Sequence, residues 1–164
     1  MNGLLIRAAR QADLQRLVEI HNTMLGELVR IAPEGFGQKM RAAQGSAALR
    51  VEYEQALDDA DSLLLVAEAQ GEIAGLALGV VERFGDDLVD APYLTVQYLA
   101  ATEGHRGKGV GRMLLAEMER WACERELSVV ELSVWPNNEA ALGLYRRMGY
   151  RELERRMAKR VGDG

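Results

Sequence analysis

The sequence has little of what metal and redox centres are built from. Its 164 residues include one cysteine and two histidines, and only 5% are aromatic. The lone Cys123 cannot form an internal disulfide, which favours a reducing compartment. With so few and dispersed ligand residues, we expect no metal site, and for Cys123 a buried or half-buried spectator thiol rather than a nucleophile.

The sequence also lacks long apolar runs. No stretch approaches the roughly 20 apolar residues of a membrane span, and residues 1–7 do not resemble a signal peptide. Hydrophobic residues make up 48% of the chain and charged residues 27%, with no break in composition. We therefore expect a single cytoplasmic domain over residues 1–164 that has no membrane partner.

Basic residues are scarce in the middle of the chain. Between Arg50 and Arg106 the sole basic residue is Arg83, although acidic residues are frequent there and the net charge is −5. This asymmetry would attract an anionic cofactor to one side and a cationic amine to the other. No basic surface with interleaved aromatic residues spans the chain, so we expect no nucleic-acid partner.

Periodicity and turn residues predict alternating strands and helices. The expected strands cover residues 4–8, 62–68, 73–81, 93–101 and 130–134, with a closing strand or tight hairpin over 150–161. The expected helices start near residues 13, 47, 110 and 139. The order β-α-α-β-β-β-α-β-α-β predicts an α/β domain with a mixed central sheet flanked by helices.

A glycine-rich turn joins the expected strand 93–101 to the next helix. Gly107, Gly109 and Gly111 alternate with basic residues, and a helix start exposes unpaired backbone N–H groups at the positive end of its dipole. A tight turn alone would also use glycine. Three alternating glycines among cations favour phosphate binding. The segment matches neither a P-loop nor a dinucleotide fingerprint.

The segment Arg106-Gly107-Lys108-Gly109-Val110-Gly111 resembles the acyl-CoA pyrophosphate loop of the GNAT superfamily of N-acetyltransferases. The resemblance implies the GNAT fold and acetyl-CoA as acyl donor. It also implies that the backbone of Leu99, Ala100 and Ala101 pairs with the pantetheine arm. The loop residues implied to bind the cofactor are Arg106, Gly107, Lys108, Gly109, Val110, Gly111 and Arg112.

A second block, from Asn138 to Tyr150, is similar to another conserved segment of the family. The resemblance implies that Tyr145 is the catalytic acid that protonates the leaving thiolate, and that Asn138 contacts the cofactor arm. Two plainer interpretations stay open. Tyr145 would simply pack on its helix, and Asn138 would only cap it.

The general base is not evident, because residues 93–102 contain no carboxylate. Glu82, Asp90 or Glu103 would have to act through water, ordered by Tyr98 or Gln97, unless the amine arrives deprotonated. His21 and His105 are weak candidates, with packing, cofactor-contact or solvent-facing roles expected.

We predict an acetyl-CoA-dependent N-acetyltransferase that acts on a primary amine, borne by a small molecule or a peptide, by direct attack in a ternary complex. The alternatives are a non-catalytic acyl-CoA sensor with the same fold and a protein that binds another nucleotide phosphate. The few residues after Gly149 and Tyr150 leave room for a minimal closing strand only. The acceptor site would then be either open to a bulky acceptor or completed by a second copy of the chain, and we expect a homodimer.

Overall fold

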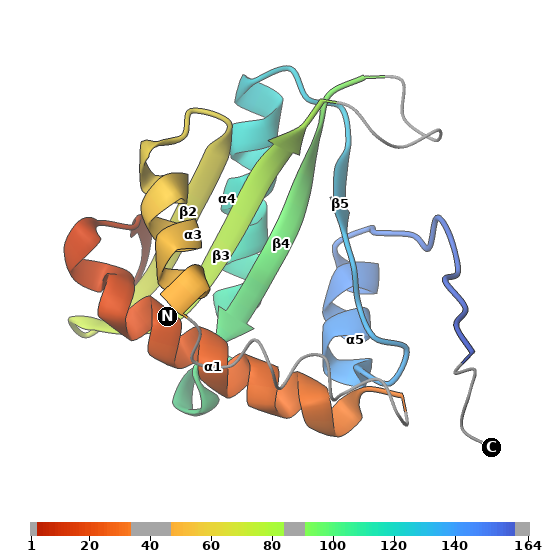
Figure 1. Cartoon of the computed structure of the whole chain (residues 1–164), viewed down its shortest axis with the longest axis horizontal. Coiled ribbons are helices and arrows are strands. Elements are labelled where there is room, and N and C mark those ends of the chain that lie inside the picture. The colour runs from red at the N-terminus through yellow and green to blue at the C-terminus, as the bar shows by residue number, and fades with distance from the viewer. Residues whose placement is uncertain (1–2, 34–46, 84–90, 160–164) are drawn as a thin grey trace.

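The computed structural model describes residues 3–33, 47–83 and 91–159. A five-stranded sheet in the order β1-β2-β3-β4-β5 forms its centre (Figure 1). The strands are β1 (Leu4–Ala8), β2 (Ser62–Ala69), β3 (Glu72–Glu82), β4 (Tyr93–Ala101) and β5 (Val130–Leu132). Neighbours from β1 to β4 are antiparallel, and β5 pairs with β4 in parallel. The mixed sheet predicted from the sequence is confirmed.

Helices cover both faces of the sheet. Helices α1 (Leu14–Ile31) and α3 (Ala47–Asp58) pack on one face, and α4 (Val110–Glu124) packs on the other. Helix α5 (Glu139–Arg147) follows β5, and the 3-10 turns η1 (Gln11–Asp13) and η2 (Glu103–His105) precede α1 and α4. None of the helices among the described residues is long and apolar enough to cross a membrane.

The two faces bury separate apolar clusters. Leu114, Leu115 and Met118 of α4 pack on one face with Leu94 and Val96 of β4. The other cluster is built from α1, α3 and the opposite face of the same strands, and its members include Leu14, Leu17, Tyr53, Leu76 and Leu78. Burial on both faces explains why β2 and β3 read as nearly continuous apolar runs.

A β-bulge in β4 changes which face its side chains occupy. Leu78 of β3 pairs with Tyr98, but the next residue, Gly79, pairs with Val96, so Gln97 is the extra residue. Val96 packs in the α4 cluster, whereas Tyr98, two residues later, packs against the α1–α3 cluster. The bulge therefore re-aims Tyr98, as bulges near functional sites commonly do.

Strands β4 and β5 separate after a short contact. Their parallel register runs only from Leu94 opposite Val130 to Val96 opposite Leu132. Beyond Val96, the β5 side of β4 has no strand partner among the described residues, while its other side still pairs with β3 as far as Ala101. Figure 1 shows β5 running away from the end of β4 toward α5.

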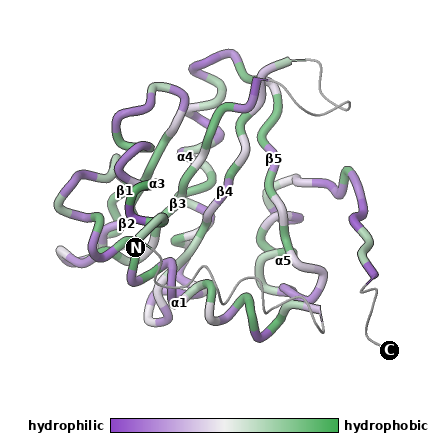
Figure 2. The backbone as a smooth tube through the Cα atoms, in the orientation of Figure 1, coloured by the Kyte–Doolittle hydropathy of each residue, from purple (hydrophilic) through white to green (hydrophobic). Residues whose placement is uncertain are grey.

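The prediction of a closing strand over residues 150–161 is wrong for the part of that range that the structure describes. Residues 151–159 contain no strand, and they run apart from the sheet as a largely hydrophilic segment (Figures 1 and 2). Alternation would place charged residues on both faces of such a strand, so neither face could be buried. Leu153 and Met157 are 65% and 88% exposed. The strand around Val130 is also shorter than expected, because it ends before Val134.

Candidate functional site

The glycine-rich turn adopts backbone conformations that require glycine. Gly107 and Gly109 have φ angles of 70° and 90°. Gly109 is the N-cap of α4 and supplies no side chain to cap it. A Cβ atom built on either glycine would meet no atom within 4 Å, so the backbone faces open space. The first turn of α4 is therefore accessible to a ligand.

Several backbone N–H groups of this turn are unpaired. The amides of Arg106 and Lys108 are turned inward, toward the carbonyls of Glu103 and His105 at 3.3 and 3.4 Å. The first bond of the helix runs from the Met113 amide to the Gly109 carbonyl at 3.0 Å. Within the described structure, the five remaining amides have no backbone acceptor. These belong to Gly107, Gly109, Val110, Gly111 and Arg112.

The cations around the turn differ in availability. Lys108 and Arg112 are exposed and form no salt bridge with a described residue. Arg106 is already paired, because its Nη2 lies 2.6 Å from both carboxylate oxygens of Glu27 on α1. Sequence reasoning missed this pair, since the two residues are far apart in the chain. An anion bound at the turn would compete with Glu27 for Arg106.

Gly111 has a different role from the two preceding glycines. A Cβ atom there would lie 3.1 Å from Leu144 Cδ2 of α5 and 3.9 Å from Leu99 Cδ2 of β4. Glycine at this position therefore lets α5 and β4 approach the start of α4. This contact joins the turn, the end of β4 and the helix that carries Tyr145.

Leu99, Ala100 and Ala101 lie on the part of β4 whose β5 side is unpaired in the described structure. An open strand edge presents alternating N–H and C=O groups to any extended polar chain. The structure therefore places these residues, which the sequence resemblance assigned to the pantetheine arm, directly before the turn with the unpaired amides.

Tyr145 lies in the last turn of α5, half-buried against the α4-side cluster. Its ring centroid lies 5.9 Å from that of Tyr150. Burial raises the pKa of the Tyr145 phenol, so the hydroxyl stays protonated at neutral pH. No hydrogen bond to that hydroxyl is found among the described residues. Packing of the ring and availability of the proton are thus compatible.

Asn138 caps α5. Its side-chain oxygen accepts a hydrogen bond from the Ala141 amide at 3.2 Å. This is the plainer of the two roles considered for this residue. Contact with the cofactor arm stays a prediction.

The acidic candidates for a general base are poorly placed. Glu82 pairs with Tyr93 at the start of β4, roughly 17 Å from Tyr98 at the usual rise per strand residue. Glu103 is exposed in η2, and Asp90 lies outside the described residues. A carboxylate that does meet β4 is that of Glu52 on α3, whose Oε1 and Oε2 lie 2.9 and 3.2 Å from the Tyr98 hydroxyl. No local motif in the sequence indicates this contact.

A buried aromatic cluster supports Tyr98. His21 is 2% exposed, and its Nδ1 lies 2.6 Å from the Tyr53 hydroxyl. The His21 and Tyr98 rings meet edge-on with centroids 4.3 Å apart. Burial lowers the pKa of His21 to about 4, so the ring is neutral at neutral pH. His21 therefore has the packing role expected for it.

Two other residues have simple environments. His105 Nδ1 lies 2.9 Å from Thr102 Oγ1, within the turn that leads into α4. Cys123 is free and exposed, so the expectation of a buried or half-buried thiol is wrong. The last turn of α4 presents it to solvent while the neighbouring Ala122 is buried.

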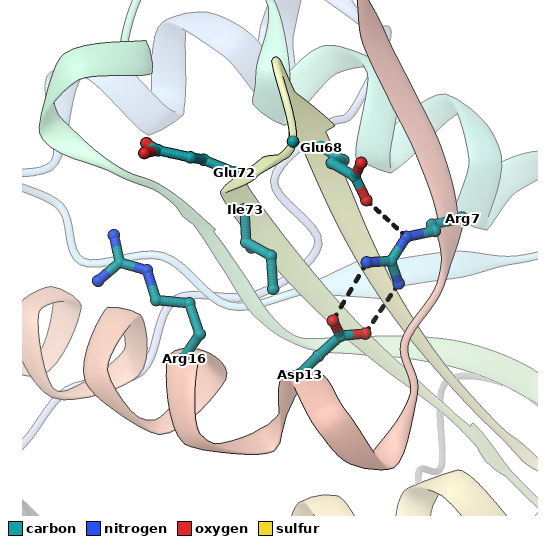
Figure 3. A pocket seen from close by; sticks show the side chains of 7 residues that line it. Arg7, Asp13, Arg16, Glu68, Glu72 and Ile73 are labelled. Atoms are coloured by element: carbon teal, nitrogen blue, oxygen red, sulfur yellow. Dashed lines mark hydrogen bonds and ion pairs between the residues drawn. The ribbon is translucent and has the colours of Figure 1, made fainter.

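A separate depression near the β2–β3 turn contains a network of ion pairs (Figure 3). Arg7 donates to both carboxylate oxygens of Asp13, at 2.8 and 3.1 Å, and to Glu68 at 2.9 Å. Hydrogen bonding from Arg7 lowers the pKa of Asp13. The arrangement ties β1 to β2 and to the start of α1, which is a structural role.

Comparison with known proteins identifies the family of this fold. The model of the acetyltransferase (GNAT) family matches residues 27–150, which include the glycine-rich turn, β4 and α5. The chain belongs to the acetyltransferase (GNAT) family. The resemblance inferred from the sequence is confirmed, and the family is one of acyltransferase enzymes.

The chain is similar to the streptothricin acetyltransferase of Streptomyces lavendulae, with 36% identity over 94 residues. This match covers 57% of the chain and 47% of the relative, so it spans about half of that protein's length.

Two solved structures share the fold. A GCN5-related N-acetyltransferase from Ralstonia eutropha JMP134 has a TM-score of 0.76 at 20% identity, with 98% of this chain and 100% of the other covered. AAC(6')-Iy in complex with the bisubstrate analogue CoA-S-monomethyl-acetylneamine also has a TM-score of 0.76, at 17% identity, with 98% and 99% covered.

Proposed function

We propose that this protein transfers an acetyl group from acetyl-CoA to a primary amine. One observation carries the proposal beyond family membership. The unpaired amides at the start of α4 directly follow the unpaired edge of β4. A helix N-terminus suits a pyrophosphate, and a strand edge suits the amide-bearing pantetheine arm.

In this proposal the amides of Gly107, Gly109, Val110 and Gly111 bind the pyrophosphate, with Lys108 and Arg112 as cationic partners. The pantetheine arm pairs with residues 99–101, which brings the thioester toward the bulge at Gln97. The amine attacks the thioester carbonyl in a ternary complex, and the carbon–sulfur bond breaks. Tyr145 then protonates the departing thiolate, since its buried phenol keeps its proton at neutral pH.

The proposed acceptor is a cationic amine. The central part of the chain, between Arg50 and Arg106, has acidic residues and only one basic residue, which favours approach of a cation from that side. One relative is named a streptothricin acetyltransferase, so streptothricin is a proposed acceptor to test. The single-domain organisation over residues 1–164 and the cytoplasmic location stay predictions.

The rival is a sensor that binds acyl-CoA without turnover, motivated by the absence of a carboxylate from β4. Release of free thiol from acetyl-CoA separates the two. We expect amine-dependent thiol release with streptothricin, neamine or a lysine-containing peptide, and mass spectrometry should show one added acetyl group. Tight binding of acetyl-CoA without thiol release across a broad amine panel would favour the sensor.

A further inference from the structure

Glu52 and Tyr98 form a polar contact at the α1–α3 face of the sheet, next to the proposed path of the pantetheine arm. Tyr98 immediately precedes Leu99, and it points to this face because of the bulge at Gln97. Without the bulge, Tyr98 would occupy the same face as Val96, which packs under α4. The bulge at Gln97 thus places the Tyr98 hydroxyl on the α1–α3 face.

The ring of Tyr98 is held firmly. His21 meets it edge-on at 4.3 Å, and Tyr53 meets it at 6.3 Å with the two planes 87° apart. Tyr53 has no exposed surface, and His21 and Tyr53 hold each other through a 2.6 Å hydrogen bond. The buried rings therefore fix the position of the Tyr98 hydroxyl at their outer end.

Glu52 is oriented by that hydroxyl but keeps acceptor capacity. The Tyr98 O–H supplies one proton to two carboxylate oxygens, at 2.9 and 3.2 Å, and an ionised carboxylate accepts about four hydrogen bonds. No cation is seen to pair with Glu52 in the described ranges of the chain. Its neighbour Glu54 differs, because Arg50 binds it at 2.9 Å on the solvent side of α3.

We propose that Glu52, positioned by Tyr98, binds the ammonium group of the amine acceptor and accepts a proton from it before attack. This assignment rests on the proposed function and supplies the carboxylate that β4 itself lacks. The protons balance. The ammonium gives one proton to Glu52, the neutral amine forms the carbon–nitrogen bond, and the carbon–sulfur bond breaks as Tyr145 protonates the thiolate. The second proton leaves the amide nitrogen and replaces the one that Tyr145 donated, and Glu52 releases its proton to solvent.

The test compares two neutralising substitutions on the same helix. Glu52→Gln keeps the size of the side chain and removes its charge, and Glu54→Gln makes the same change two residues away. Initial rates are measured with streptothricin and neamine as acceptors. We expect Glu52→Gln to lower kcat/KM for the amine by about 10- to 100-fold, the range for losing a charged hydrogen bond. The KM for acetyl-CoA should not change, and Glu54→Gln should resemble the parent protein.

Two further variants separate positioning from packing. Tyr98→Phe keeps the ring packed between His21 and Tyr53 but removes the hydroxyl. We expect it to lower kcat/KM for the amine, by less than Glu52→Gln does. Glu52→Asp keeps the charge and should recover part of the activity lost in Glu52→Gln. A thermal unfolding scan of each variant checks that the aromatic cluster is intact.

The outcomes discriminate between the two proposals. Equal amine kinetics for Glu52→Gln and Glu54→Gln, with turnover present, would overturn the role of Glu52 and leave the acetyltransferase proposal standing. Absence of turnover in the parent protein would overturn the proposed function. In that case calorimetry of neamine with the CoA-bound protein still decides the binding role, which is refuted if Glu52→Gln leaves the affinity unchanged.

Discussion

Replacing Gly109 by glutamate tests the anion site at the start of α4. The φ angle of 90° is costly for any residue with a Cβ atom, by about 1–2 kcal/mol. A single domain usually has about 5–15 kcal/mol of stability, so the variant should still fold. The new side chain would meet open space, since no atom lies within 4 Å of a Cβ built there.

The effect on binding comes from charge. A carboxylate about 5 Å from a pyrophosphate charge is repelled by about 3 kcal/mol at an effective dielectric constant of about 20, and screening in an exposed turn reduces this. We therefore expect Gly109→Glu to weaken acetyl-CoA binding by about 10- to 100-fold. Gly109→Ala carries the same backbone strain without the charge, and we expect its affinity for acetyl-CoA to fall only a few-fold.

Titration calorimetry with acetyl-CoA at low and high salt measures both variants. The difference between Gly109→Glu and Gly109→Ala should shrink as salt rises, because exposed charges are screened. If the two folded variants bind acetyl-CoA equally well at low salt, the pyrophosphate does not lie at this turn, and the assignment of the loop is refuted.

Three further predictions address other parts of the molecule. Tyr145→Phe should lower kcat while leaving acetyl-CoA affinity nearly intact; unchanged turnover across the pH range in steady-state assays would show that another group protonates the thiolate. His21 has a folded pKa of about 4, below its unfolded value near 6.5, so its contribution to stability is complete above pH 6.5 and is lost as the pH falls toward 4. In urea unfolding, the free energy of unfolding should fall by about 2 kcal/mol between pH 7 and pH 5. The His21→Gln variant should not show this decrease if His21 is its source. We also propose a homodimer in which the second copy covers Leu153 and Met157, 65% and 88% exposed; a monomeric mass in light scattering at micromolar concentration would contradict it.

Local sequence signals predicted the elements that carry the loop. Gln70 and Gly71 have φ angles of 54° and 84°, the positive values of a tight hairpin, so that turn and its strands followed from composition. Gly149, with a φ of 92°, ends α5 as glycine commonly ends helices. Both features depend on a few adjacent residues, which is why the sequence indicates them.

The features that sequence reasoning missed depend on contacts between distant segments. The pairs Glu52 with Tyr98 and Glu27 with Arg106 join residues 46 and 79 positions apart. The bulge that turns Tyr98 toward α3 arises from the way β4 pairs with β3. The sequence of residues 93–101 contains no local signal that predicts it. The closing strand was expected over residues 150–161, although a strand there would carry charged residues on both faces and so have no apolar face to bury.

Hydrogen exchange of backbone amides with and without acetyl-CoA tests the central claim most directly. The account predicts slower exchange on binding in two segments only, residues 97–101 on the β4 edge and residues 107–112 at the start of α4, because these hold the amides without described partners. Exchange in β1 and β2 should not change. Binding of acetyl-CoA with protection confined to other segments would contradict the account.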